Sequence, residues 1–163
     1  MSTLPLPDLI DSILILLTES YAGPPDPSAT WFIDNAPDSG VLGILAGVDA
    51  EEASRSVDGT REPGTTIASH AEHLRWSLAV TAAELRGQPF STNWDESWQV
   101  STLDAEEWDR LRRDLRSEYM NVSQAIKERT ELSGDVLNDV LALLPHAAYH
   151  LGNIRQMIER LRA

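Results

Sequence analysis

The segment that decides the fold and the chemistry of this chain runs from Pro145 to Gln156 and reads PHAAYHLGNIRQ. It contains His146 and His150, which are four residues apart, so a helix places both imidazoles on one face, about one turn from each other. The other two histidines of the chain, His70 and His73, form a second close pair. Two such pairs on two predicted helices raise the question of whether they meet around a metal ion.

Outward from this segment, apolar residues recur at helical spacing from about residue 135 to 161 and predict one long helix, which we expect Pro145 to kink. The same spacing predicts helices over residues 8–21, 67–87 and 105–130, and no segment has the alternation of a strand. The sequence therefore predicts an all-α fold. We expect a four-helix bundle with a long connection between its first and second helices, built as a single domain over residues 1–163.

The long connection, residues 26–63, is expected to hold short helical turns near residues 41–45 and 49–54. Its aromatic residues Trp31 and Phe32 are expected to anchor it over one end of the bundle. The segment 93–98 is expected to be a polar loop. The first helix is apolar nearly all around, which predicts burial on more than one side and a homodimer.

Composition narrows the possible partners. The chain has 13 basic and 26 acidic residues, a net charge of −13, which argues against nucleic acid because phosphate backbones are bound by clustered Lys and Arg. No segment approaches the roughly 20 apolar residues of a membrane span, and the N-terminus lacks the basic stretch of a signal peptide. We expect a soluble cytoplasmic protein that acts on a small molecule.

The phase of the two predicted helices favours His70 over His73 as the partner of the pair formed by His146 and His150. His70 and His150 fall inside the apolar stripes of their helices, whereas His73 and His146 fall at the edges. Imidazoles clustered in a core would leave polar nitrogens without partners, which costs free energy. One divalent ion bound by His70, His146 and His150 would give these nitrogens a partner. Three protein ligands with an open position are typical of a reactive metal site, whereas a structural site has four.

Two other kinds of metal site are excluded. The chain has no cysteine, so it cannot build a thiolate zinc site or supply its own nucleophilic thiol. In zincin metalloproteases a glutamate follows the first histidine of the pair and acts as the base, but Ala147 occupies that position here.

These residues resemble the DinB-like family, also described as YfiT-type metal-dependent hydrolases. The matching segments are TIASHAEHLRW from Thr66 to Trp76 and HAAYHLGNIR from His146 to Arg155. The resemblance implies a four-helix bundle with a metal held by one histidine of the second helix and the His-x-x-x-His pair of the last, hence His70, His146 and His150. The chain departs from the family after the last histidine, where Leu151-Gly152-Asn153 stands in place of Arg-Gly-Gln.

The resemblance implies a metal-dependent enzyme, either a transferase that uses an external low-molecular-weight thiol or a hydrolase that uses metal-bound water. The metal is expected to be divalent, with Zn²⁺ or Ni²⁺ favoured among the ions that suit imidazole ligands. Residues considered for the second shell or for substrate contact are Asp139, Glu72, Asn153 and Tyr149. The alternative function is a non-catalytic, metal-binding or stress-related dimeric bundle.

Overall fold

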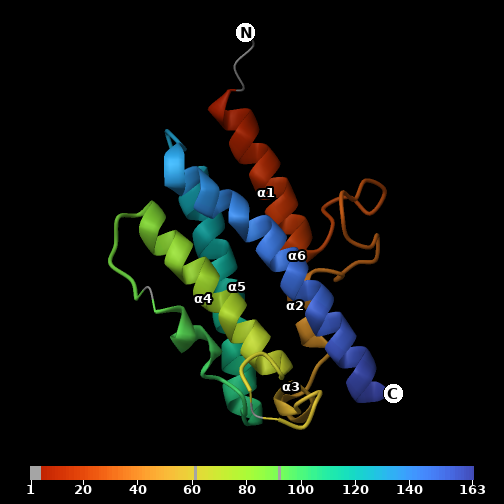
Figure 1. Cartoon of the computed structure of the whole chain (residues 1–163). Helices are drawn as coiled ribbons and strands as arrows, with labels where there is room; N and C mark the ends of the chain where they lie inside the picture. The colour runs from red at the N-terminus through yellow and green to blue at the C-terminus, as the bar shows by residue number, and fades with distance from the viewer. Residues whose placement is uncertain (1–4, 61, 92) are drawn as a thin grey trace.

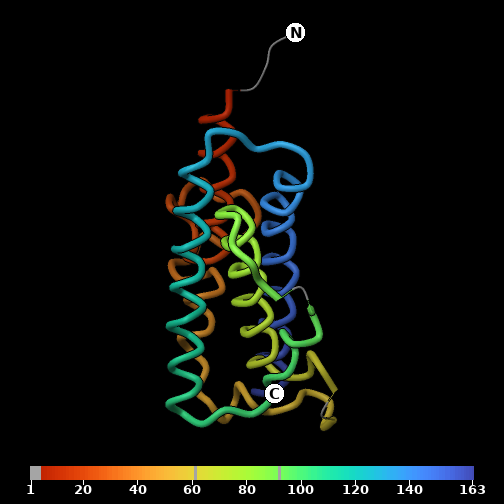
Figure 2. Tube along the Cα trace, turned by 90° about the vertical axis from the view of Figure 1, so that its left-hand side faces the viewer, coloured from red at the N-terminus to blue at the C-terminus, as the bar shows by residue number. Residues whose placement is uncertain are grey.

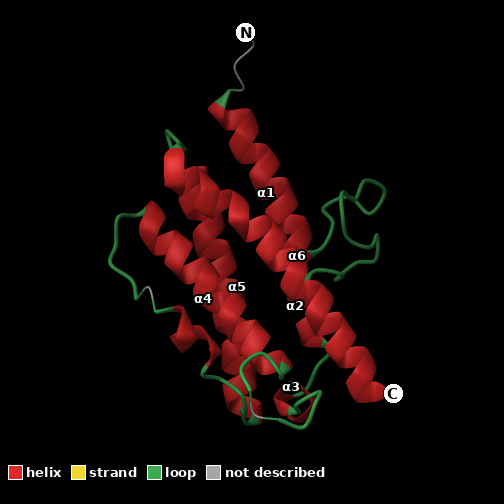
Figure 3. Ribbon diagram, viewed as in Figure 1, coloured by secondary structure: helices red, strands yellow, loops and turns green. Residues whose placement is uncertain are grey.

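The computed structural model describes residues 5–60, 62–91 and 93–163, and helices and loops account for all of this part of the chain (Figure 3). The predicted all-α class is confirmed. The elements are the α-helices α1 (Leu6–Ala22), α2 (Val41–Ala46), α3 (Ala50–Ser54), α4 (Ile67–Leu85), α5 (Ala105–Lys127) and α6 (Gly134–Arg162), with the 3-10 helix η1 (Trp94–Trp98) between α4 and α5.

The four long helices lie close to their predicted ranges and surround one apolar core. Helix α4 lies along α5, as Figures 1 and 2 show from two sides, and α6 packs against both α4 and α1. The α4–α6 contact brings the two histidine-bearing helices together, a neighbour relation that helical periodicity cannot predict. The largest fully buried apolar side chains come from every long helix and include Leu17, Leu74, Leu78, Trp108, Leu115, Ile126 and Ile154.

Local signals explain where the long helices begin. The side chain of Thr66 accepts a hydrogen bond from the backbone N–H of Ser69 and so caps α4. Asp104 caps α5 in a reciprocal arrangement with Glu107, in which each side chain accepts from the backbone N–H of the other. Helix α6 continues through Pro145 to Arg162. The short helices α2 and α3 are found where the sequence predicts helical turns.

The segment predicted as a polar loop contains η1, which packs against α4. The side chain of Asn93 accepts from the backbone N–H of Asp95 and caps this short helix. The 3-10 helix η1 covers the side of α4 on which His73 lies, so the buried face of α4 is wider than its apolar stripe. His73 is only 7% exposed, although the helical phase placed it at the edge of the apolar stripe.

The loop between α1 and α2, the orange segment at the right of Figure 1, is held in a way that the sequence did not suggest. The prediction that Trp31 and Phe32 anchor it is wrong, since these side chains are 71% and 43% exposed. The anchor is Glu19 of α1, which is fully buried and accepts hydrogen bonds from the backbone N–H groups of Trp31, Phe32 and Ile33 at 2.9 to 3.1 Å. The loop turns its backbone inward, so its aromatic side chains face outward.

The first part of α1 is buried along one side, through Ile10, Ile13 and Leu17, while Ile15 is 47% exposed. Near its end the helix is buried on more than one side, as predicted, because the consecutive residues 19–21 are all buried. The homodimer inferred from its apolar character stays a prediction. Within the described residues, no helix is both long enough and apolar enough to cross a membrane.

Candidate metal centre

All four histidines of the chain meet where α4 and α6 pack together. His73, His146 and His150 each offer one ring nitrogen to a group whose members lie within 4.8 Å of one another, an arrangement that could hold a metal ion. His70 lies outside that group, although its Nδ1 is 2.7 Å from Nδ1 of His150. The geometry thus favours His73, whereas the sequence reasoning favoured His70, as the partner of the His-x-x-x-His pair.

Hydrogen bonds assign the protonated nitrogen of His73. Its Nδ1 lies 2.6 Å from Oγ of Ser97, and this hydroxyl donates its only proton to the carbonyl oxygen of Trp94, also at 2.6 Å. Since Ser97 has no second proton to give, Nδ1 of His73 is the donor and its Nε2 carries a lone pair. The ring of His73 is also stacked on Trp98 at 3.9 Å between centroids, which holds its orientation.

The same reasoning applies to His70 and His150. Nε2 of His70 lies 3.0 Å from the carbonyl oxygen of Gly64, which can only accept, so this nitrogen is a donor. The unprotonated Nδ1 of neutral His70 then accepts from Nδ1 of His150 at 2.7 Å. Nε2 of His150 is therefore left with a lone pair, as it is in His73.

His146 completes the group. Its Nδ1 is 3.1 Å from Oγ of Ser77, which can donate or accept, and its Nε2 is 3.0 Å from Nε2 of His73. When Ser77 donates, Nε2 of His146 is protonated and donates to His73. When Ser77 accepts, two lone pairs face each other at 3.0 Å, and a cation bound between them removes the repulsion. In that case the Nδ1–H groups of His73, His146 and His150 are held by Ser97, Ser77 and His70, respectively. Histidine ligands usually have their second ring nitrogen held in this way.

Burial keeps the cluster neutral. Desolvation lowers the pKa of His73 to about 4, and the positive charge that His146 and His70 would carry when protonated adds to this shift. Desolvation is also the largest cause that lowers the pKa of His150, His70 and His146. Neutral imidazoles are the form that binds metal ions, so these side chains are ready to act as ligands at neutral pH.

The metal-free protein is expected to lose stability as the pH falls below about 6.5, the ordinary pKa of histidine. Above that pH both the folded and the unfolded chain hold neutral imidazoles. Below it, the unfolded chain takes up protons that the folded cluster accepts only at lower pH, so the free energy of unfolding decreases towards about pH 4. Urea unfolding between about pH 7.5 and 5.5 measures the effect, in a range where most carboxylates stay ionised.

The control is a protein with His73 and His150 both replaced by glutamine, which should show a weaker dependence on pH over the same interval. Parallel loss of stability in the two proteins would contradict a role of the cluster.

A cavity of about 700 Å³ opens above the cluster. Trp98, Pro63 and Gly64 form one wall and α6 forms the other. Gly64 has φ +79°, a conformation that side chains rarely adopt, and this turn presents its carbonyl oxygen to His70. The four histidines thus line a cavity that is large enough to admit a small molecule.

Of the four residues predicted for the second shell or for substrate contact, two line this cavity and two lie elsewhere. Tyr149 and Asn153 line this cavity, and the ring of Tyr149 lies edge-on to His150 with 5.0 Å between centroids. Glu72 forms a two-bonded ion pair with Arg75, both contacts at 2.7 Å. Asp139 lines a separate cavity of about 230 Å³ that reaches the other side of His146.

Sequence reasoning missed Ser77, Ser97 and Trp98 as neighbours of the cluster. Ser97 and Trp98 follow Asn93, whose ability to cap a helix was the one local sign of η1. For Ser77 the only signal is its position four residues after His73, on the same face of α4.

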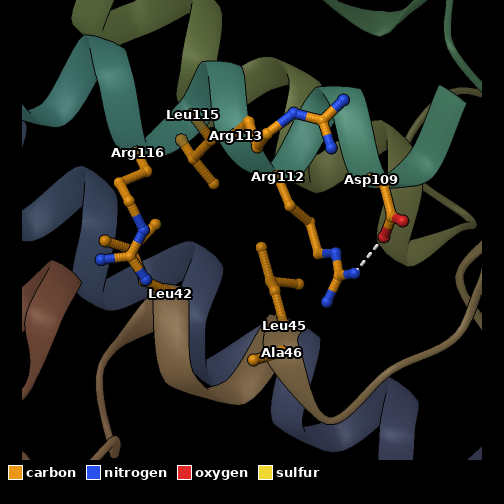
Figure 4. A pocket seen from close by; sticks show the side chains of 8 residues that line it. All are labelled: Leu42, Leu45, Ala46, Asp109, Arg112, Arg113, Leu115 and Arg116. Atoms are coloured by element: carbon orange, nitrogen blue, oxygen red, sulfur yellow. Dashed lines mark hydrogen bonds and ion pairs between the residues drawn. The ribbon is translucent and has the colours of Figure 1, made fainter. Parts of the chain in front are cut away.

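Another pocket lies between α2 and α5 and is shown in Figure 4. It measures about 330 Å³ and is lined by apolar residues of α2 together with charged residues of α5, where Arg112 is paired with Asp109. None of its described lining residues is a histidine.

No protein-family model matches the chain, and neither a curated protein nor a solved structure matches it.

Proposed function

We propose that this chain is a metal-dependent enzyme whose divalent ion is bound by His73, His146 and His150. The observation that carries the proposal is the convergence of three ring nitrogens within 4.8 Å, with Ser97, Ser77 and His70 available to hold the opposite nitrogen of each ring. In this assignment His70 is a positioning residue. It accepts from His150 and donates to the carbonyl oxygen of Gly64.

The donor set fits a divalent ion such as Zn²⁺ or Ni²⁺, because imidazole suits both and no thiolate is present. A metal with three protein ligands supplies Lewis-acid chemistry, since it lowers the pKa of an external thiol or of water and thereby provides a nucleophile at neutral pH. The 700 Å³ cavity gives such a molecule access to the ligand nitrogens. That access supports catalysis over a purely structural metal site, which is closed by a fourth protein ligand.

The reaction we propose is transfer of an external low-molecular-weight thiol to an electrophile, with hydrolysis by activated water as the second form of the same chemistry. Both fit a site without its own nucleophile, because the chain has no cysteine and Ala147 takes the position of the zincin glutamate. Residues of the chain would orient the reactants: Trp98 and Tyr149 flank the histidines, and Asn153 offers an amide one turn beyond His150.

We also propose that the chain is a single DinB-like four-helix bundle. Its support is the pairing of one histidine of α4 with the His146-x-x-x-His150 pair of α6, on long helices that lie near the predicted ranges. The family resemblance implies that combination, although the α4 histidine favoured by the geometry is His73.

Metal analysis of tag-free protein tests the proposal first. We expect about one equivalent of divalent metal per chain after exposure to excess ion and removal of the unbound fraction. The Co²⁺ form should then change its visible spectrum when 2-mercaptoethanol is added, because the thiolate becomes a ligand. Far less than one equivalent would overturn the metal site. Full occupancy without a response to thiols or to azide would overturn the enzyme and leave a structural ion.

A further inference from the structure

The cavity above the histidines continues well beyond them along α6. Its lining on this helix follows one stripe at spacings of three and four residues, which a single helical face produces. Past the last histidine, the stripe consists of Asn153, Gln156, Met157 and Arg160. Arg160 comes ten residues after His150, so the two positions are separated by about 15 Å along the helix axis. The cavity therefore has a histidine end and an arginine end.

The charges at the arginine end differ from those of the rest of the chain. Although the sequence has twice as many acidic as basic residues, no Asp or Glu is found among the described residues that line the cavity. Arg160 is the one arginine or lysine among the described residues that line the cavity. The cavity thus has a positive end in a protein whose net charge is −13.

Neighbouring arginines of α6 are engaged in ion pairs, and Arg160 is not. Arg155 binds Asp34 at 2.7 Å and Arg162 binds Glu52 at 2.7 Å, and these pairs tie α6 to the α1–α2 loop and to α3. Within the described part of the chain, Arg160 has no carboxylate within ion-pairing distance. Its guanidinium is therefore available to bind an anion, with a geometry that suits carboxylate and phosphate groups.

The walls between the two ends are mostly apolar. Val57 and Pro63 lie on the loop side and Met157 on the α6 side, while Asn153 and Gln156 each add an amide. A molecule that spans the cavity would bury an apolar or weakly polar middle segment against these side chains.

We propose that the substrate is an elongated small organic anion, whose charged end binds Arg160 while its reacting end lies at the histidine cluster. This inference rests on the proposed function, because it requires the cluster to hold a metal that accepts an external ligand. It goes further in assigning the class of substrate and the residue that selects it. Arg160 acts on binding and orientation, so its loss should weaken recognition of the anion and leave metal binding intact.

The test uses the Co²⁺-loaded protein and two series of thiols, the ω-mercaptoalkanoates and the ω-mercaptoalcohols of equal length. Their sulfur serves as the metal ligand, and their tails differ only in charge. Spectroscopic titration should show that the wild-type protein prefers the carboxylate by about three- to tenfold at low ionic strength, once the chain is long enough to reach Arg160. The preference should shrink as salt is added, because the charges are partly exposed.

Two variants with the same change of net charge separate a local from a general effect. Arg160→Gln should abolish the preference for the carboxylate and keep the affinity for Co²⁺ and 2-mercaptoethanol. Arg110→Gln changes an exposed residue of α5 outside the cavity and should keep the preference.

Equal binding of both series by the wild-type protein, or an unchanged preference in Arg160→Gln, would overturn the inference while the proposed function stands. Failure of every thiol, including 2-mercaptoethanol, to change the spectrum would overturn the thiol-transfer function itself and this inference with it.

Discussion

The His73→Ala variant is expected to lose more than about 100-fold in affinity for Co²⁺ or Zn²⁺, because it removes one of the three proposed ligand nitrogens. The His70→Ala variant is expected to lose about 10- to 100-fold, the range typical of residues that orient a ligand. Competition with a chelator of known affinity measures both values. The two residues lie one turn apart on α4, so the comparison changes the same residue type within the same helix.

Glutamine variants make the distinction sharper. A glutamine at position 70 can accept from Nδ1 of His150 through its oxygen and donate to the carbonyl oxygen of Gly64 through its amide, which reproduces both contacts of His70. We therefore expect His70→Gln to recover most of the affinity lost in His70→Ala. His73→Gln should not recover affinity, because an amide is a poor ligand where an imidazole nitrogen is needed.

Asn153→Ala is the matched control on α6. It changes a residue that lines the same cavity one turn beyond His150 and should leave metal affinity nearly unchanged. The opposite pattern, with metal lost in His70→Gln and kept in His73→Ala, would contradict our assignment and restore the ligand set His70, His146 and His150 that the sequence predicted.

The Glu19→Ala variant is expected to lower the free energy of unfolding by about 3 kcal/mol or more. The carboxylate is fully buried and accepts from three consecutive backbone N–H groups, and a hydrogen bond to a charged group contributes about 1.5–3 kcal/mol. Alanine leaves these groups without an acceptor and creates a cavity next to α1. Since domains of this size are stable by about 5–15 kcal/mol, the loss is a large fraction of the total.

Glu19→Gln should lose less than Glu19→Ala, because its amide oxygen can still accept from the loop while the charge is gone. Glu131→Ala, at an exposed position in the α5–α6 connection, should change stability by less than about 0.5 kcal/mol. Urea unfolding gives the free energies, and hydrogen exchange of the amides of residues 31–33 should become faster in Glu19→Ala. A loss no larger than that of Glu131→Ala would show that the carboxylate does not hold the loop.

Helix positions were predictable because their causes are local. Apolar residues at helical spacing, the cap at Thr66 and the reciprocal cap at Asp104 act over a few residues, so the four long helices lie close to their predicted ranges. The pairing of His146 with His150 was equally secure, since four residues make one helical turn. The anchor of the α1–α2 loop was not predictable, because it joins Glu19 to backbone groups more than ten residues away.

What the sequence determined by itself is the chemistry available to this protein: an all-α chain with two histidine pairs, no cysteine and a strongly acidic composition. Which histidine of α4 joins the pair of α6 was decided only by the tertiary structure. The helical phase shows only where a residue lies relative to the apolar stripe of its own helix. It contains no information about burial by another element that packs on that helix. Here η1 covers His73, orients it through Ser97 and Trp98, and turns its Nε2 towards His146.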